Sequence, residues 1–177
     1  MATDVPHRDF DPIDVELRDG RRVTLRAIRS DDREGLQTAV RALSPEARYS
    51  RFFSPLRELP ASLLERATHP DADELQLVAV VGGTIVAGAR YAATAEAGCC
   101  EFGVAVLDDW HGVGLARRLL ETLMRTARAR GFEHMEAYVL ATNVAMLRLA
   151  ERVGFVPVQS PEGPSVRLLR RPLADVG

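Results

Sequence analysis

The first part of the chain alternates apolar and polar residues in two runs, which predicts a β-hairpin. Apolar side chains occupy every second position from Ile13 to Leu17 and again from Val23 to Ala27. Asp19-Gly20 between the runs has the composition of a tight hairpin turn. Ser30-Asp31-Asp32 then supplies a capping residue and an acidic first turn, so we expect a helix that extends to about Leu43.

Two further helical segments are predicted before residue 70. Ser44-Pro45-Glu46 starts the first, because serine is a preferred capping residue and proline is well tolerated in the first turn. Pro60 starts the second, which ends before Pro70. The chain is therefore expected to be helical between its N-terminal hairpin and the strands that follow.

The segment from residue 75 to residue 107 predicts three consecutive antiparallel strands. Its apolar runs are rich in Val, Ile and Ala, and short breaks separate them. Gly82-Gly83 forms the first break, and the loop from Glu96 to Gly98 forms the second. The three predicted strands are Leu75 to Val81, Thr84 to Tyr91 and Cys99 to Leu107.

The rest of the chain predicts one strong helix, followed by strands and a shorter helix. Apolar residues recur at helical spacing after residue 114, and this pattern ends at Gly131. Asn143 caps a second helix that runs through Val153. The predicted strands are Glu133 to Leu140, Phe155 to Val158 and Val166 to Leu169. Together these elements indicate an α/β fold.

Length and composition fit one globular domain. The chain has 177 residues, of which 46% are hydrophobic and 27% charged, so we expect a single domain over residues 1–177 with its core at about 22–158. The formal net charge is −2, which argues against a surface built to neutralise nucleic-acid phosphates. We therefore expect no nucleic-acid partner.

The absence of Lys excludes two catalytic mechanisms, and the two cysteines indicate a reducing compartment. All 23 basic residues are Arg, so a P-loop and Schiff-base catalysis, which both need Lys, are excluded. Cys99 and Cys100 are adjacent and have no metal-ligand set around them, so we expect neither a disulfide nor a metal, and a reducing cytoplasm. The stretch from Met1 to Pro6 lacks the build of a signal peptide, and no apolar run is long enough to span a membrane. We therefore expect a soluble, cytoplasmic protein without a membrane partner.

Gly112-Val113-Gly114 lies between a predicted strand and the strongest predicted helix, which is a generic anion-binding arrangement. Glycine lets the backbone approach a ligand closely, and the N–H groups of a first helical turn have no helical partners. The same glycines also fit a plain tight turn. A dinucleotide-binding fingerprint would place a third small residue at position 117, which holds Arg117. The spacing therefore leaves a pyrophosphate site and a structural turn both open.

Two segments together resemble the acyl-CoA signature of the GNAT N-acetyltransferases. They are Val106 to Ala116 and Asn143 to Phe155, and the similarity covers about residues 25–155. The stretch from Leu43 to Phe53 further resembles the bacterial protein-lysine acetyltransferase branch of that family. Within the signature Gly114 and Ala116 match the family pattern, whereas His111 stands where the family has Gln or Arg.

The resemblance implies a GNAT-like fold, with a mixed, mostly antiparallel central sheet and helices on both faces. The strand from Cys99 to Leu107 would carry a bulge and splay from the strand formed by Glu133 to Leu140. Acetyl-CoA would lie in the resulting cleft as the co-substrate, and its pantetheine arm would add to the sheet like a further strand. No metal is expected in the reaction.

The resemblance also implies which residues bind acetyl-CoA. The pyrophosphate would meet backbone N–H groups of the glycine loop, and Arg117 or Arg118 would reach the phosphate oxygens. Asn143 would bond the pantetheine arm while also acting as a helix N-cap. The expected contacts are Val104, Ala105 and Val106 for the pantetheine, and His111, Gly112, Val113, Gly114, Leu115 and Ala116 for the pyrophosphate.

Transfer to an amine requires a base, and Glu101 is the candidate. A Lys-like amine with a pKa of about 10.4 is neutral in only about one molecule in 2,500 at pH 7. Glu101 interrupts an otherwise apolar strand just before Val104, and it occupies the place where several family members carry their base. Many relatives have a proton-donating Tyr where this chain has Ala150, so the general acid is open, with Tyr138 or water as substitutes.

The sequence thus predicts an N-acetyltransferase that moves acetyl from acetyl-CoA to a primary amine by direct attack. The acceptor is open between a protein lysine and a small amine such as a polyamine, an amino acid or an aminoglycoside. A catalytically silent acyl-CoA-binding regulatory module is the other alternative. Acyl-chain preference, regulatory partners and the oligomeric state, a homodimer included, are open as well. An acidic rim is expected to steer a cationic acceptor, and it consists of Asp71, Asp73, Glu74 and Glu96.

Overall fold

A computed structural model describes residues 10–177, which form eight strands and five α-helices. The stretch from Met1 to Pro6, expected to hold no signal peptide, lies outside the described residues. The strands are β1 (Ile13–Glu16), β2 (Arg22–Ala27), β3 (Glu74–Val81), β4 (Thr84–Ala93), β5 (Cys99–Val106), β6 (His134–Leu140), β7 (Val156–Val158) and β8 (Val166–Pro172). The helices are α1 (Arg33–Ala42), α2 (Pro45–Phe52), α3 (Ala61–Thr68), α4 (Leu115–Ala129) and α5 (Val144–Arg152), and single 3-10 turns lie at Ser30–Asp32 and Asp108–Trp110.

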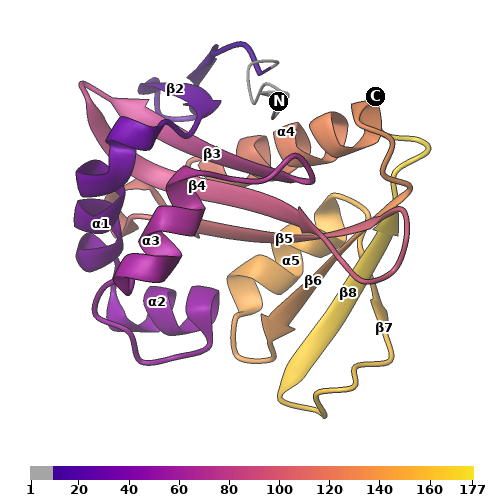
Figure 1. The fold of residues 1–177 in the computed structure, drawn as a ribbon. Coiled ribbons are helices and arrows are strands. Elements are labelled where there is room, and N and C mark those ends of the chain that lie inside the picture. Colours follow the sequence, from indigo (N-terminus) through magenta and orange to yellow (C-terminus); the bar gives the residue numbers. More distant parts are fainter. Residues whose placement is uncertain (1–9) are drawn as a thin grey trace, which may run out of the picture.

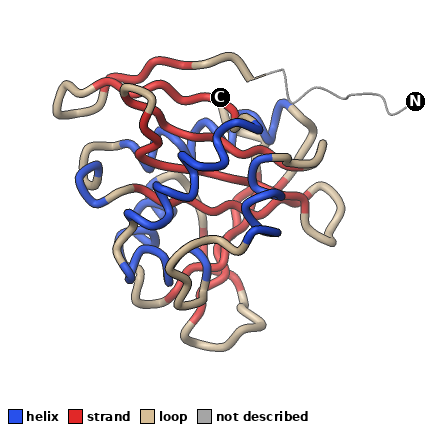
Figure 2. Tube along the Cα trace, turned by 60° about the vertical axis from the view of Figure 1, so that its left-hand side comes forward, coloured by secondary structure: helices blue, strands red, loops and turns tan. Residues whose placement is uncertain are grey.

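The described strands form one sheet in the order β1-β2-β3-β4-β5-β6-β8-β7. Neighbouring strands in it are antiparallel except β5 and β6, which are parallel and are joined through α4. A parallel pair needs such a crossover, because a tight turn can join only antiparallel strands. Figure 2 shows the strands as one layer with the β1–β2 hairpin at an edge. The expected mixed, mostly antiparallel sheet is confirmed.

Helices cover both faces of this sheet (Figure 1). On one face α1 buries Leu36 and Val40 against Val78 of β3 and Ile85 of β4. On the other face α4 and α5 pack against the sheet, and the apolar positions that predicted α4 are all buried there. Burying one such side chain stabilises the fold by about 1.5–3 kcal/mol. The buried apolar residues of α4 are Leu115, Leu119, Leu120, Leu123, Met124 and Ala127.

The bulge expected in β5 is wrong. The register between β4 and β5 is continuous from the pair Ala87↔Val106 to the pair Ala93↔Cys100, and the irregularity lies instead at Ala79/Val80, where β3 pairs with β4. β6 pairs with β8 along its whole length. The two strands therefore separate because each stays with its own antiparallel neighbour, and β5 needs no extra residue.

Candidate active site

The sheet divides between β5 and β6, and a cavity of about 750 Å³ opens in the gap. The parallel pairing is limited to three residue pairs, Cys99↔His134, Cys100↔Met135 and Glu101↔Glu136. Beyond them β6 turns away from β5 together with β8, as Figure 1 shows. Both strands line the cavity, together with α2, α5 and the start of α4. The expected splay is confirmed.

The open edge of β5 forms one wall of this cavity. Val104, Ala105 and Val106 all line it, and each is paired with β4 on the opposite edge only. The Nε2–H of His111 donates to the carbonyl oxygen of Val106 at 2.7 Å, so this one carbonyl already has a partner. The remaining outward backbone groups offer a ladder for an extended ligand, as a sheet edge does for an added strand.

The glycine loop points a row of free N–H groups at the other end of the cavity. Gly112 and Gly114 have φ values of +73° and +90°, a conformation that side chains other than glycine's rarely allow. Within the described residues, the N–H groups of positions 112 to 117 have no protein acceptor. The N–H of His111 differs, because it donates to the carbonyl oxygen of Asp108 at 3.1 Å. With the dipole of α4 behind them, the free groups have the arrangement that an anion-binding site requires.

The N-terminal hairpin supports this loop, a contact that no pattern in the sequence predicts. The backbone N–H of Arg18 donates to the carbonyl oxygen of Val113 at 3.1 Å, and Val113 itself does not line the cavity. Arg21 donates to the carbonyl oxygen of Asp109 at 2.9 Å, and its guanidinium lies 3.8 Å from the ring centroid of Trp110. The Arg18 side chain passes beside Gly114 and adds a cation to the anion site.

The other predicted cofactor contacts lie in the same cavity. His111, Gly112, Gly114, Leu115, Ala116 and Arg117 line it, whereas Arg118 does not. The Arg117 guanidinium donates to Glu121 at 2.8 Å, one turn along α4. Asn143 also lines the cavity, and its Oδ1 accepts from the N–H of Met146 at 3.2 Å. The cap therefore uses the oxygen of Asn143 and leaves its Nδ2 donors to a ligand.

Two carboxylates meet at the point where the strands separate. Glu101 and Glu136 are the last residue pair of the β5–β6 contact, and their side chains leave the same face of the sheet. Partial loss of water raises the pKa of Glu101, and repulsion by Glu136 raises it further, while Arg51 and Arg90 oppose the shift. Both carboxylates, with Tyr138 of β6, line a basin of about 460 Å³ that adjoins the cleft.

Arg51 of α2 is a site residue that the sequence did not single out. Its guanidinium lies against β5, since a Cβ added at Gly103 would be 2.7 Å from Arg51 Cζ. Burial, followed by repulsion from Arg90, lowers the pKa of Arg51 to about 10, so the side chain stays charged at neutral pH. Charged residues on a short helix are usually solvated, so no pattern in the sequence distinguishes Arg51 from a surface residue.

The model of the Acetyltransferase (GNAT) family matches residues 37–155 of this chain. The chain belongs to the GNAT acetyltransferases. Acetyltransferase PA5475 of Pseudomonas aeruginosa is 36% identical over 151 residues, which are 82% of this chain and 81% of that protein. Acetyltransferase Pat of Mycolicibacterium smegmatis is 32% identical over 86% of this chain, which spans 46% of the length of that relative.

Solved structures agree with this assignment. The GNAT domain of S. lividans PAT superposes with a TM-score of 0.86 at 35% identity, over 91% of this chain and 96% of that one. The yncA protein of Salmonella typhimurium, solved with its cofactor acetyl-CoA, has the same fold with a TM-score of 0.68 at 20% identity, over 86% of this chain and 95% of that one. Acetyl-CoA is the acyl donor of GNAT enzymes, and this chain is one of them.

The position where many GNAT enzymes carry a Tyr is occupied by Ala150, which is fully buried. The cavity wall from α5 consists instead of Val144, Ala145, Met146, Leu149 and Arg152. Of these side chains none has a hydroxyl group. Tyr138, one of the expected substitutes, does line the cavity, and loss of water followed by repulsion from Glu136 raises its pKa. This phenol therefore keeps its proton at neutral pH.

One group of side chains has the composition of a metal site. Ligand atoms of Glu96, Cys99 and Glu136 lie within 4.8 Å of one another. Arg170 already forms two hydrogen bonds with Glu96, at 2.6 and 2.9 Å, and lies 3.9 Å from Glu136. Burial raises the pKa of Cys99, so its thiol holds its proton. A guanidinium thus already compensates these carboxylates.

None of the described helices has both the length and the apolar character that crossing a membrane requires.

We predict that Gly114→Val lowers the affinity for acetyl-CoA at least about tenfold, because a side chain at φ +90° distorts the anion site and crowds Arg18. Gly131→Val is the matched control, since Gly131 has a φ of +93° and open space around it, at the far end of α4. Calorimetric titration of both folded variants measures the effect. Equal losses in the two variants, or none in Gly114→Val, contradict the assignment of the loop.

Proposed function

We propose that this chain transfers the acetyl group of acetyl-CoA to a primary amine by direct attack, with Glu101 as the general base. The observation that carries the proposal is the place of Glu101. It ends the short β5–β6 contact, and the open edge of β5 begins directly after it. A thioester bound along that edge brings its carbonyl carbon beside this carboxylate.

The residues proposed to hold acetyl-CoA extend along the cleft from this point. The backbone of Val104 to Val106 pairs with the pantetheine, and the Nδ2 of Asn143 donates to the same arm. The free N–H groups of residues 112–116 and the Arg18 guanidinium bind the pyrophosphate. Arg117, which is paired with Glu121, lies at the rim of this anion site. The ligand is thus held at both ends of the gap.

The proposed step forms a C–N bond and breaks a C–S bond. The neutral amine attacks the thioester carbonyl carbon, and its departing proton passes to Glu101 directly or through a water molecule. Deprotonating a Lys-like amine at pH 7 costs about 4.6 kcal/mol, which the base helps to overcome. The raised pKa of Glu101 makes it a stronger base than an ordinary carboxylate. CoA leaves as a thiolate, and Tyr138, which lines the cavity from β6, is the group proposed to return a proton to it.

Glu101→Gln keeps the shape of the side chain and removes its proton affinity. We predict a loss of about 10²-fold in turnover with acetyl-CoA affinity within a few-fold of the wild type. Glu16→Gln, an exposed change on β1, is the control. Thiol release and calorimetry measure the two quantities. Turnover near the wild-type value assigns the base to another group, and a wild type that binds acetyl-CoA without releasing thiol favours the silent regulatory module.

The pH dependence of kcat/KM tests the coupling between the two carboxylates. The base acts when it is deprotonated, so kcat/KM rises with pH through the raised pKa of Glu101. Glu136→Gln removes a negative neighbour, which lowers the pKa of Glu101, and the acidic limb of the profile moves to lower pH. Glu16→Gln leaves the limb in place. If the acidic limb does not move in Glu136→Gln, it reflects the titration of a group other than Glu101, and the assignment of Glu101 as the base is contradicted.

A protein lysine is a second candidate for the acceptor, favoured by the relatives named Pat and by α2, whose sequence resembles that branch and which lines the cleft. The acidic rim supports it only in part. Glu74 is paired with Arg90 at 3.1 Å and Glu96 with Arg170, so these two charges are compensated. Asp71 and Asp73 are exposed beside the start of β3 and keep their negative charge free for steering.

The double variant Asp71→Asn/Asp73→Asn tests this acceptor. If a cationic protein surface is steered to the cleft, the variant raises the KM for a lysine peptide by about two- to tenfold and flattens its salt dependence. The affinity for acetyl-CoA stays unchanged. Since the chain contains no Lys, any acetyl-lysine detected by mass spectrometry comes from an added protein. Folded proteins that acquire no acetyl-lysine contradict the protein-lysine candidate.

A further inference from the structure

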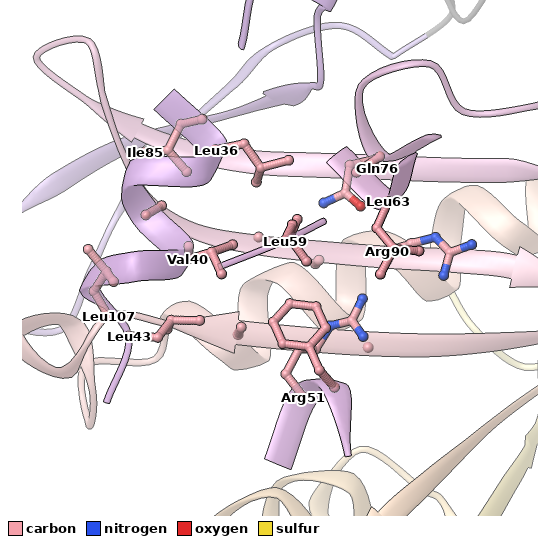
Figure 3. A pocket seen from close by; sticks show the side chains of 18 of the residues that line it. Leu36, Val40, Leu43, Arg51, Leu59, Leu63, Gln76, Ile85, Arg90 and Leu107 are labelled. Atoms are coloured by element: carbon pink, nitrogen blue, oxygen red, sulfur yellow. The ribbon is translucent and has the colours of Figure 1, made fainter. Parts of the chain in front are cut away.

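A second cavity adjoins the active-site basin beneath α1 and α3, on the face of the sheet that Glu101 shares (Figure 3). Its volume is about 250 Å³. A cavity of about 150 Å³ already admits a benzene molecule, so this one has room for a side chain of several carbons. Most of its wall is apolar, and Figure 3 labels Leu36, Val40, Leu43, Leu59, Ile85 and Leu107 there.

One end of this cavity is cationic. Figure 3 shows the side chains of Arg51, Arg90 and Gln76 together at that end, away from Leu36 and Ile85. Arg90 is paired with Glu74 at 3.1 Å. Arg51 forms no ion pair or hydrogen bond with any residue that the structure describes, and its Cζ lies 5.1 Å from the ring centroid of Phe52. The charge of Glu101 acts on Arg51 without a direct contact, so the guanidinium keeps its hydrogen-bond donors free for an anionic ligand group.

Arg51 is also the point where the hollows of the site meet. It lines the acetyl-CoA cleft, the carboxylate basin and the apolar cavity, and so does Gly103 beneath it. Glu101 stands two residues before Gly103 on the same face of β5, a separation of about 6.6 Å along a strand. A free cation, a carboxylate and an apolar pocket therefore surround one small volume.

We infer that the acceptor of this site is an α-amino acid with an apolar side chain. Its α-amine lies toward Glu101, its carboxylate binds Arg51, and its side chain enters the apolar cavity. The inference rests on the proposed function and names its substrate class. The α-nitrogen forms a bond to the acetyl carbon, the C–S bond breaks, the amine proton goes to Glu101, and CoA leaves as the thiol after protonation. A lysine side chain or a polyamine has no anionic group to pair with Arg51.

The first test compares leucine with 3-methylbutylamine, which is leucine without its carboxylate, in a thiol-release assay with acetyl-CoA. The expected kcat/KM is at least about 10²-fold higher for leucine, because a site built around a charged group rejects an analogue that lacks it. Leucine amide, which keeps the side chain and loses the negative charge, behaves like the amine when the two are compared at equal concentrations of neutral amine. Equal values for leucine and the amine overturn the inference.

Variants of Arg51 locate the carboxylate. Arg51→Met is expected to raise the KM for leucine at least about tenfold, a larger change than in the KM for acetyl-CoA or in the kcat/KM for 3-methylbutylamine. Arg51→Lys restores part of the loss because it keeps the charge without the planar fork. Arg57→Met removes an exposed charge outside the three hollows and is the matched control. A change confined to the KM for acetyl-CoA assigns Arg51 to the cofactor and overturns the inference.

A variant on α1 tests the apolar pocket. Ala39→Leu fills part of the cavity from α1 and is expected to lower kcat/KM for leucine at least about tenfold while leaving that for alanine within about threefold. Circular dichroism confirms that the variant is folded, and parallel losses for both amino acids contradict the pocket.

Acetylation of a lysine peptide or spermidine, with no amino acid accepted, defeats the inference and leaves the proposed function intact. Absence of thiol release with every amine defeats both.

Discussion

The site depends on a short parallel contact between two halves of the sheet. β5 and β6 share three residue pairs, after which each strand stays with its own antiparallel neighbour. Extending the contact by a few residues would close the gap and cover the edge of β5. Shortening it would detach the half of the sheet that carries β6, β7 and β8 from the half that carries the hairpin. The length of this contact thus determines both the width of the cleft and the closeness of its two carboxylates.

The parallel direction of this contact also places the anion site. A chain that leaves β5 must cross over the sheet before it can enter β6 in the same direction, and α4 makes that crossing. The N-terminal end of α4 consequently lies at the end of β5, next to the open edge. The helix dipole and the strand edge can then act on the two ends of a single extended ligand. Neither the helix dipole nor the strand edge depends on a particular reactive side chain.

Local patterns in the sequence were sufficient to predict most helices and strands, but not to predict how these elements are arranged. The apolar spacing of α4 and the alternation before and after Asp19-Gly20 gave the correct structures, because burial of one face imposes those periods. No local pattern carries the length of the β5–β6 contact, and the expected bulge in β5 was wrong because the strand follows β4 without interruption. Glu101 was detectable as a charge in an apolar strand. Arg51 and Arg18 were not detectable in this way. Their positions in the site depend on contacts with Gly103 and Val113, which lie about 50 and 95 positions further along the chain.

The hairpin of β1 and β2 lies outside the residues that match the family model, which begin at residue 37. Yet the backbone N–H of Arg18 bonds to Val113 in the glycine loop, and the Arg21 side chain bonds to Asp109 in the 3-10 turn just before that loop. Part of the preorganisation of that loop is therefore encoded outside the motif by which it is recognised. Two family members with identical glycine motifs can differ in how rigidly the loop is held, because their N-terminal segments can make different contacts with it. Divergence in cofactor affinity within such a family can accordingly arise without any substitution at the cofactor site.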